Sequence, residues 1–528
     1  MRRALVLALV LSASSAAAAE YRAYWVDTFH TPLGTHQDID RVLEVAEASH
    51  ANALFVEVRR RGDSWYLDTL EPLTEVSAVG EPGADGKWTF DPLRYLIERA
   101  HARSIQVHAF VIAGAVFRGD PAKDPLPRDP NHVFLQHVWD AEHGRPYDGP
   151  RQWATRSSSG RYEFDGDWYL DFGHPAAVEY TLDVLLHLVR AYDIDGIHLD
   201  RVRYPEAPRG DVGYNTVSVA RFRAKYGDRA RYDAAGNPRN DDPLWEQWRR
   251  DQVTQFMRRF YLNATAIKPS LVISAALIAW ADGPRRSGGF RSTDAYTHVY
   301  QDWSAWLDEG IIDMAVPMLY KREHVARERA QFDDWLSFVT AKAHADGRLA
   351  VAGIGAYMNG IEGTLRQARR ARAAGADGVL MFAVGDTEPW STADNSTNAA
   401  LRRNPFRYDA PGHPTPKRPN EDFAAAVSEG MNATGTARFE TPRQAPLFGR
   451  EEPPPPKPTA TGIMGFAPDT DAVNIESSAS RHIVQPDADG FFGVANLPPG
   501  EYRINGSCIV EVDRGRITRV DLPCTAGM

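Results

Sequence analysis

Eight short apolar or β-branched runs recur through about the first 400 residues, and this repetition constrains the fold most strongly. Segments with helical periodicity separate the runs. In the first such segment, Ile39, Val42, Leu43 and Ala46 share one face, and Thr35 is suited to be the N-cap. Eight strand–helix alternations predict a (β/α)₈ TIM barrel over residues 20–403. The predicted strands are 22–29, 53–59, 105–112, 195–204, 271–278, 313–320, 349–357 and 378–385.

The predicted links between these elements are unequal in length. Links from helix to strand are short, whereas three links from strand to helix are long, at residues 62–91, 113–173 and 206–242. Links that follow strands form the C-terminal face of an α/β barrel, where active sites lie. Because long loops in a compact domain are usually functional, we expect a functional site at that face.

Composition and the N-terminus limit the partners and the compartment. The 528-residue chain has a formal net charge of −10, which gives no overall attraction to nucleic acid or to an anionic membrane. Residues 1–19 combine a charged start, a short apolar run and a small-residue end, which is typical of a secretory signal. We therefore expect an exported protein, periplasmic or secreted, with no membrane insertion. No phosphate-binding loop or convincing dinucleotide motif is present, so no cofactor is expected.

A different pattern follows residue 403. Residues 404–459 are polar and include a proline-rich stretch, 452–458, that is typical of a stiff linker. Residues 460–528 show short β runs between turns, which predicts a small all-β sandwich. Cys508 and Cys524 both lie in this module, and the sequence leaves open whether they pair.

The ends of the predicted strands carry carboxylates, cations and aromatic rings, a set suited to a polyhydroxylated substrate. Two carboxylates can divide the nucleophile and acid/base roles across a glycosidic bond. Asp200 ends an otherwise apolar strand, which favours a catalytic role over a structural one. Asp386 ends the eighth strand. The residues expected to bind substrate are Trp25, Asp27, Arg59, His108, His198, Arg201, Arg203, Tyr204, Trp280, Tyr320, Tyr357 and Asn359.

Two other carboxylates are candidates for the proton donor, and the sequence does not choose between them. Glu57 alternates with Val56 and Val58, so it should point into the barrel or its mouth. Arg59 lies on the same side of that strand, which makes a structural ion pair an alternative. Glu323 lies in the loop beyond the sixth strand, where a solvated carboxylate is the alternative.

Metal catalysis has weaker support. His198 and Asp200 alternate toward the same side of their strand, and His108 could join them. These three scattered ligands would suit a metal-dependent hydrolase or deacetylase. The sequence has no His-Glu-x-x-His motif, so we expect no metal and a hydrogen-bonding role for His198.

Several segments carry a family resemblance in order and spacing, notably 52–59, 168–175 and 192–200. With them, residues 21 to about 400 resemble the bacterial glycosyl-hydrolase-like proteins of the family 10-like group, formerly a domain of unknown function. The resemblance implies a TIM barrel acting on glycans, including peptidoglycan strands without stem peptides, and a carboxylate at Asp200. The family commonly has a second acid at the position of Arg201 and glutamine at that of Glu57. With Arg203, these departures indicate a more anionic glycan.

The same reasoning gives one leading hypothesis and, besides the metal-dependent hydrolase or deacetylase, one further alternative. The leading hypothesis is an exported glycoside hydrolase in which Asp200 is nucleophile or general base, kept ionised by the neighbouring arginines. The alternative is a glycan-binding barrel without catalysis, suggested by Arg201 and by the C-terminal module. That module, through segments 490–492 and 497–502, resembles carboxypeptidase-regulatory-like domains, which implies an accessory role.

Overall fold

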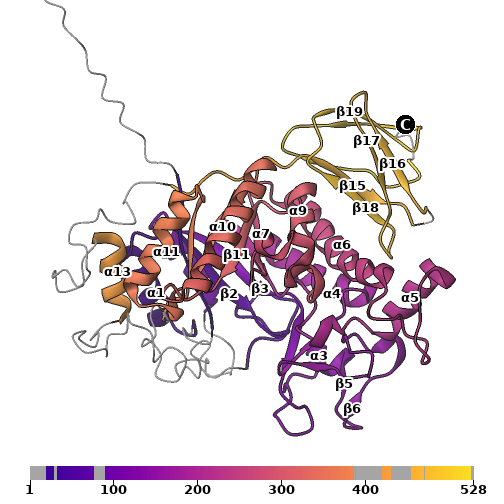
Figure 1. Ribbon diagram of the computed structural model, residues 1–528, viewed down its shortest axis with the longest axis horizontal. Helices are drawn as coiled ribbons and strands as arrows, with labels where there is room; N and C mark the ends of the chain where they lie inside the picture. The colour runs from indigo at the N-terminus through magenta and orange to yellow at the C-terminus, as the bar shows by residue number, and fades with distance from the viewer. Residues whose placement is uncertain are drawn as a thin grey trace, which may run out of the picture.

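The computed structural model describes residues 19–28, 33–75, 90–385, 387, 419–429, 453–468 and 470–524. The predicted signal segment up to residue 18 lies outside these ranges, and so does Asp386. Figure 1 shows a large α/β body, with the C-terminal β module beside it. No helix in the described part of the chain combines the length and apolarity needed to span a bilayer.

The α/β body is a closed parallel barrel. Its strands follow one another in hydrogen-bonded order, and the pairing of β10 with β11 closes the ring. Two short segments, β12 and β13, both pair with β11 and together fill one of the eight positions. The predicted (β/α)₈ barrel is therefore confirmed. The strands are β1 (Tyr21–Val26), β2 (Ala53–Arg59), β3 (Gln106–Ile112), β9 (Gly196–Asp200), β10 (Val272–Leu277), β11 (Met314–Leu319), β12 (Leu349–Ala350), β13 (Ala352–Gly355) and β14 (Gly378–Phe382).

Helices cover the outside of the barrel, and local sequence explains where they begin. The Thr35 side chain accepts a hydrogen bond from the Asp38 backbone N–H at the first helix. Asp91 and Asp242 cap two others, each followed by a proline in the first turn. The covering helices are α1 (His36–Ala48), α2 (Pro92–His101), α4 (Pro175–Ala191), α6 (Pro243–Ile267), α9 (Trp303–Glu309), α10 (Ala326–Ala345) and α11 (Ile361–Ala373), with α13 (Pro419–Glu429) packed on α1.

Alternation along each strand separates two apolar layers. In β2, Leu54 and Val56 pack toward the helices, whereas Phe55 belongs to the cluster inside the barrel. In β1, Tyr24 faces outward and Trp25 inward. The barrel is thus filled by side chains, and a substrate can reach only its open end.

The long link after β3 builds a small insertion at that end. Its antiparallel sheet contains β4 (Ala115–Arg118), β7 (Glu163–Phe164) and β8 (Asp167–Tyr169). A second ribbon pairs β5 (Trp139–Asp140) with β6 (Arg145–Pro146) beside α3 (Val133–His137). The long link after β9 contains α5 (Thr216–Tyr226).

The C-terminal module has only β-strands among its regular elements in the described residues, which confirms the all-β prediction. Two small sheets enclose an apolar core that includes Ile463, Phe492 and Tyr502. One sheet holds β15 (Gly462–Phe466), β18 (Phe491–Ala495) and β21 (Ile517–Arg519); the other holds β16 (Val473–Glu476), β17 (Arg481–Val484), β19 (Gly500–Ile504) and β20 (Cys508–Val512).

The module is docked on α6. Arg259 of that helix lies 2.8 Å from Asp489 and 3.3 Å from Asp487 of the module. A Cβ atom at Gly493 would lie 2.2 Å from Leu262 Cδ1, so a larger residue there would require the Leu262 side chain to move. The linker is also held, because Lys457 Nζ donates to the Leu271 carbonyl oxygen at 2.7 Å.

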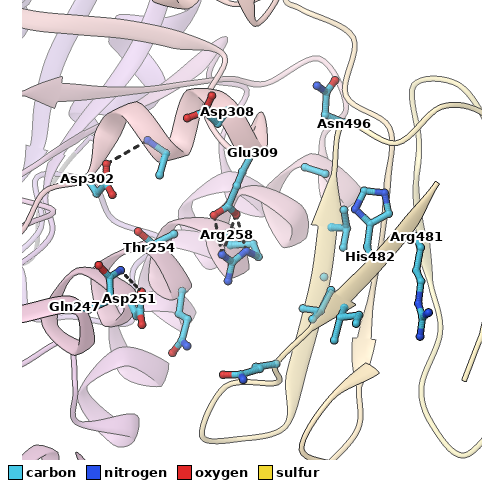
Figure 2. Close-up of a pocket in the computed structure, with 18 of the residues that line it drawn as sticks. Gln247, Asp251, Thr254, Arg258, Asp302, Asp308, Glu309, Arg481, His482 and Asn496 are labelled. Atoms are coloured by element: carbon cyan, nitrogen blue, oxygen red, sulfur yellow. Dashed lines mark hydrogen bonds and ion pairs between the residues drawn. The ribbon is translucent and has the colours of Figure 1, made fainter. Parts of the chain in front are cut away.

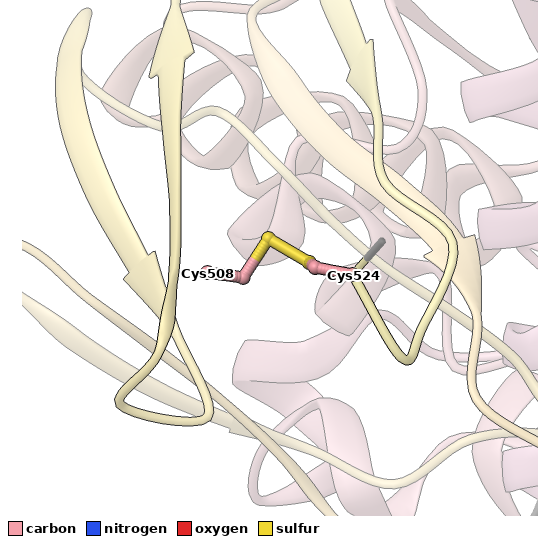
Figure 3. The surroundings of a disulfide bond; sticks show 2 residues. All are labelled: Cys508 and Cys524. Carbon is pink, nitrogen blue, oxygen red and sulfur yellow. A yellow bond between two sulfur atoms is a disulfide. The ribbon is translucent and has the colours of Figure 1, made fainter. Parts of the chain in front are cut away.

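Cys508 and Cys524 form a disulfide within the module, with Cα atoms 6.0 Å apart (Figure 3). Replacing both by serine is expected to lower the module's free energy of unfolding by about 2–4 kcal/mol, because the closed loop no longer restricts the unfolded chain. Denaturant unfolding of the C508S/C524S protein, with and without reductant, measures this loss. Reductant should shift the wild type and leave the double variant unchanged; an unshifted wild type would contradict the prediction.

Candidate active site

The C-terminal mouth of the barrel brings several carboxylates together. Asp200 ends β9 opposite Ile112 of β3 and is partly exposed. Glu57, on β2, points inward and is 1% exposed; Asp27 follows β1 and is 2% exposed. Burial raises the pKa of Tyr320 well above its usual value, and the charges of Asp200 and Asp27 raise it further. Asp27 follows β1, Glu57 lies on β2 and Asp200 ends β9, so all three belong to the C-terminal half of the barrel.

Glu57 lies in an environment that favours its neutral form. Its carboxyl accepts hydrogen bonds from the Thr28 backbone N–H, at 2.7 Å, and from the Thr28 hydroxyl. Burial raises the pKa of Glu57 to about 7, although these two hydrogen bonds act in the opposite direction. A carboxyl group that still holds its proton near neutral pH can act as a general acid.

Aromatic rings line the floor of the mouth. The Trp25 ring lies 6.2 Å from that of Tyr320 and 5.8 Å from that of Phe382. Tyr357 completes the group, 6.0 Å from Tyr320 and 6.1 Å from Phe382. Such a floor offers apolar faces against which sugar rings can pack, while the carboxylates beside it accept hydrogen bonds from hydroxyl groups.

The arginine after Asp200 turns away from it. The Arg201 backbone N–H donates to Asp200 Oδ1 at 2.6 Å, but its guanidinium pairs with Asp167 of β8, also at 2.6 Å, and with the Tyr169 hydroxyl. The ion pair of Arg201 is therefore with Asp167; burial acts to lower the pKa of Arg201, but the charge of Asp200, after that of Tyr169, raises it. The backbone there adopts a φ of 51°, and this turn directs the side chain toward the insertion.

The second arginine of this segment stays at the mouth. The Arg203 guanidinium lies 5.3 Å from the Trp280 ring, a cation–π distance. Trp280 is partly exposed, and Arg203 is 8% exposed. Both residues therefore remain candidates for contact with substrate.

The two histidines lie below the mouth. His198 is buried, its Nδ1 is 2.9 Å from Ser274 Oγ, and its ring lies 5.6 Å from Trp25. Burial lowers its pKa to about 3, so the ring is neutral. His108 lies deeper, stacked on Phe55 at 4.3 Å, which contradicts its predicted contact with substrate.

Two predicted charged residues are engaged in structural pairs. Arg59 and Glu71 form a bidentate pair at 2.7 Å, with both side chains 0% exposed, so Arg59 does not face the mouth. Glu323 is 2% exposed and pairs with Arg370 of α11. This pairing holds Glu323 among the outer helices and leaves Glu57 as the better proton donor.

Two predicted substrate contacts are buried elsewhere. Tyr204 is 1% exposed, packs near Phe172 and directs its hydroxyl toward Asp171 at 3.4 Å. Asn359 is 0% exposed; it accepts the Glu323 backbone N–H at 2.7 Å and donates to the Lys321 carbonyl oxygen at 3.0 Å. Both residues therefore organise the loops around the mouth and do not line it.

The structure also adds residues that the sequence did not indicate. Phe382 is the last residue of β14, where an aromatic side chain looked like ordinary core. Asp167 and Tyr169 come from the insertion, 33 and 31 positions before Asp200 in the sequence. The Trp168–Asp171 stretch carried part of the family resemblance, which was the available signal for this second group.

No group of three histidine, cysteine, aspartate or glutamate side chains in the described ranges is arranged to hold a metal ion. The metal-dependent alternative would need His108 beside Asp200. Packing against Phe55 holds His108 in the lower half of the barrel instead.

A cleft of about 750 Å³ lies between the barrel and the module (Figure 2). Its acidic side chains are already engaged: Asp251 accepts from Gln247 at 2.7 Å, and Glu309 pairs with Arg258 at 2.8 Å. The cleft shares none of the mouth's carboxylates. It therefore has neither the paired acids nor the aromatic floor that define the mouth.

A closed (β/α)₈ barrel with carboxylates and aromatic rings at its C-terminal mouth is typical of barrels that act on glycans. The chain belongs to the glycosyl hydrolase-like 10 family, whose profile matches residues 20–354. The family resemblance in the sequence is therefore confirmed. The matched range ends within β13, so β14 and the C-terminal module lie beyond it.

Curated relatives are similar over part of their length. The chain is 24% identical over 288 residues to glycosyl hydrolase YngK of Bacillus subtilis (strain 168), which covers 54% of this chain and 49% of that protein. It is 24% identical over 307 residues to glycosyl hydrolase DigH of Escherichia coli (strain K12), covering 56% and 58%. The chain thus spans about half the length of the curated relatives it matches.

Two solved structures match most of this chain at low sequence identity. The glycoside hydrolase domain of PgaB (BpsB) from Bordetella bronchiseptica matches 73% of this chain and 98% of that chain, with a TM-score of 0.48 and 14% identity. The catalytic domain of a β-amylase from Paenibacillus polymyxa matches 74% and 98%, with a TM-score of 0.48 and 13% identity.

Proposed function

We propose that this protein is an exported glycoside hydrolase, periplasmic or secreted, that cleaves a bacterial polysaccharide. Peptidoglycan glycan strands are the first substrate to test. The observation that carries the proposal is the difference between two carboxyl groups at one mouth. Asp200 is partly exposed at the end of β9, whereas burial raises the pKa of Glu57 to about 7. Unequal environments of this kind separate the two roles of glycosidic cleavage.

In this mechanism Glu57 donates its proton to the leaving oxygen of the glycosidic bond. Asp200 acts on the other side of the sugar, as nucleophile or as the base that activates water. The backbone N–H of Arg201, 2.6 Å from Asp200 Oδ1, holds that carboxylate in place. Tyr320 and Tyr357, which are partly exposed, present apolar surface to the sugar rings, and the buried Trp25 packs against Tyr320.

The D200N variant tests the assignment. It is expected to lose at least about 10³-fold in kcat, since it keeps the shape of the side chain and removes the charge. Release of reducing ends from purified peptidoglycan and from other bacterial polysaccharides measures activity. The D193N variant is the control, because Asp193 precedes the same strand at the opposite end and its side chain is 82% exposed.

The outcomes separate the competing functions. Cleavage by the wild type and by D193N, with none by D200N, supports the proposal. Full activity of D200N would remove Asp200 from the mechanism. Tight binding of a polysaccharide by the wild type without release of reducing ends would favour the glycan-binding alternative.

A further inference from the structure

One edge strand of the C-terminal module lies along the cleft between that module and the barrel. In the described part of the chain, β17 is the end strand of its sheet and pairs with β16 alone. Side chains from both faces of β17, His482 on one and Ile483 on the other, line the cleft, so the open edge of the strand is directed into it. The opposite wall is formed by α6 and α9 (Figure 2).

A hydrogen bond at the hairpin shows which backbone groups of β17 are directed into the cleft. The Ser477 N–H donates to the Ser480 carbonyl oxygen at 2.8 Å, so these two residues form a hydrogen-bonded pair. Such pairs alternate along antiparallel strands, and His482 therefore forms the next one with β16. The N–H and C=O groups of Arg481 and Ile483 consequently point away from β16, toward the cleft.

The cleft has room for an added segment of chain. Its volume of about 750 Å³ lies within the range of ligand-binding pockets. The open edge of a strand is a template for another strand, which pairs with it roughly 4.8 Å away. Ile483, 64% exposed, adds apolar surface. The described residues that line the cleft include no phenylalanine, tyrosine or tryptophan, so a peptide fits this surface better than a sugar ring does.

Two carboxylates on the opposite wall have only neutral hydrogen-bond partners among the described residues. Asp251 of α6 accepts from the Gln247 side-chain amide at 2.7 Å, and Asp302, the N-cap of α9, accepts from the Ala305 backbone N–H at 3.3 Å. Burial raises the pKa of both carboxyl groups, while the charges of more distant basic side chains act in the opposite direction. A cationic side chain of a ligand would supply the missing ion pair.

We infer that this cleft binds an extended basic peptide, which pairs with the open edge of β17 and directs cationic side chains to Asp251 and Asp302. A second copy of this chain fits less well, because its own β17 faces its own barrel. The peptide would contact the module and the barrel together, away from the carboxyl groups of the mouth. The inference therefore stands apart from the proposed hydrolase activity.

Synthetic peptides test the inference on the intact protein. The probe alternates valine with lysine and is blocked at both ends, and a matched peptide carries glutamate in place of lysine. Two further versions of the probe are methylated on the backbone nitrogens of the lysines or of the valines. Calorimetry should show at least about tenfold weaker binding of the glutamate peptide and of one methylated version, since alternate N–H groups of a strand point to the same side.

Substitutions then locate the peptide in the cleft. I483P removes one N–H from the open edge, where a sheet tolerates proline, and should weaken binding of the probe about fivefold. I509P is the matched control, because Ile509 is 54% exposed on β20, at the other edge of the same sheet and outside the cleft. D251N/D302N should weaken binding at least about tenfold, and D193N should not. Circular dichroism verifies that each variant is folded.

Several results would overturn the inference. They are no binding of the probe, equal affinity for the lysine and glutamate peptides, equal affinity for the probe and both methylated versions, and equal affinity of I483P and I509P. Displacement of the probe by a purified glycan strand would also overturn it, since the cleft would then be a polysaccharide site. Sedimentation velocity provides the last test: a dimer that I483P dissociates would assign the edge to a second copy instead.

Discussion

The E57Q variant is expected to lose about 10²- to 10⁴-fold in kcat/KM, because an amide cannot donate a proton to the leaving oxygen. For the wild type, burial raises the pKa of Glu57 to about 7, so activity should fall as pH rises through that value. The variant should lack this alkaline limb. Initial rates of reducing-end release, measured from about pH 4 to about pH 9, test both effects.

The same carboxyl group links stability to pH. Below its ordinary pKa of 4.5, Glu57 is protonated in both the folded and the unfolded chain; between 4.5 and about 7, only the folded chain keeps the proton. The contribution of Glu57 to folding stability is therefore full below pH 4.5, declines by about 3 kcal/mol between pH 4.5 and about 7, and does not change further above that. Denaturant unfolding of the E57Q protein should show a correspondingly smaller decline.

The control is E44Q, since Glu44 is an exposed residue of α1. It should match the wild type in rate and in stability at every pH. A wild-type rate and an unchanged alkaline limb in E57Q would show that another group donates the proton.

The largest loss of stability is expected from R59M. The Glu71 carboxylate would lose its bidentate partner in the interior and would keep the hydrogen bond from the Tyr180 hydroxyl, at 2.7 Å. An uncompensated buried charge of this kind typically lowers the free energy of unfolding by about 3–5 kcal/mol. Denaturant unfolding followed by circular dichroism measures the loss.

A second substitution makes this test specific. R59M/E71M removes both charges and should recover most of the lost stability, since an apolar pair of similar size is often tolerated. R103M removes an arginine whose pair with Glu47 is solvent-exposed, so less than about 1 kcal/mol should be lost. If R59M were as stable as R103M, the Arg59–Glu71 pair would have no structural role.

The sequence predicted the barrel well because its information is local and periodic. All eight predicted runs overlap strands of the barrel, since a parallel strand buried on both faces must be apolar throughout. Alternation also indicated correctly that Glu57 points inward. For Asp200, the end of an apolar run was enough to place the carboxylate at the open end.

The remaining site residues depend on contacts that periodicity does not contain. Arg59 follows a register shift between β2 and β3, so strict alternation misplaces it. Arg201, the residue after its strand, has a positive φ. Non-glycine residues rarely adopt a positive φ, so the direction of its side chain could not be predicted from the sequence. The position of the Glu323 side chain depends on its ion pair with Arg370, 47 residues away in the sequence. The three arginine partners of Asp167 lie on three separate segments.

The C-terminal module is held in one orientation on the barrel, and this affects how the module would bind a polymer. A module on a free tether searches a volume set by linker length, and its local concentration follows chain statistics. Here the Lys457 and Arg259 contacts replace that search with one orientation. Any polymer that binds to this module would therefore reach the barrel at a constant distance and angle.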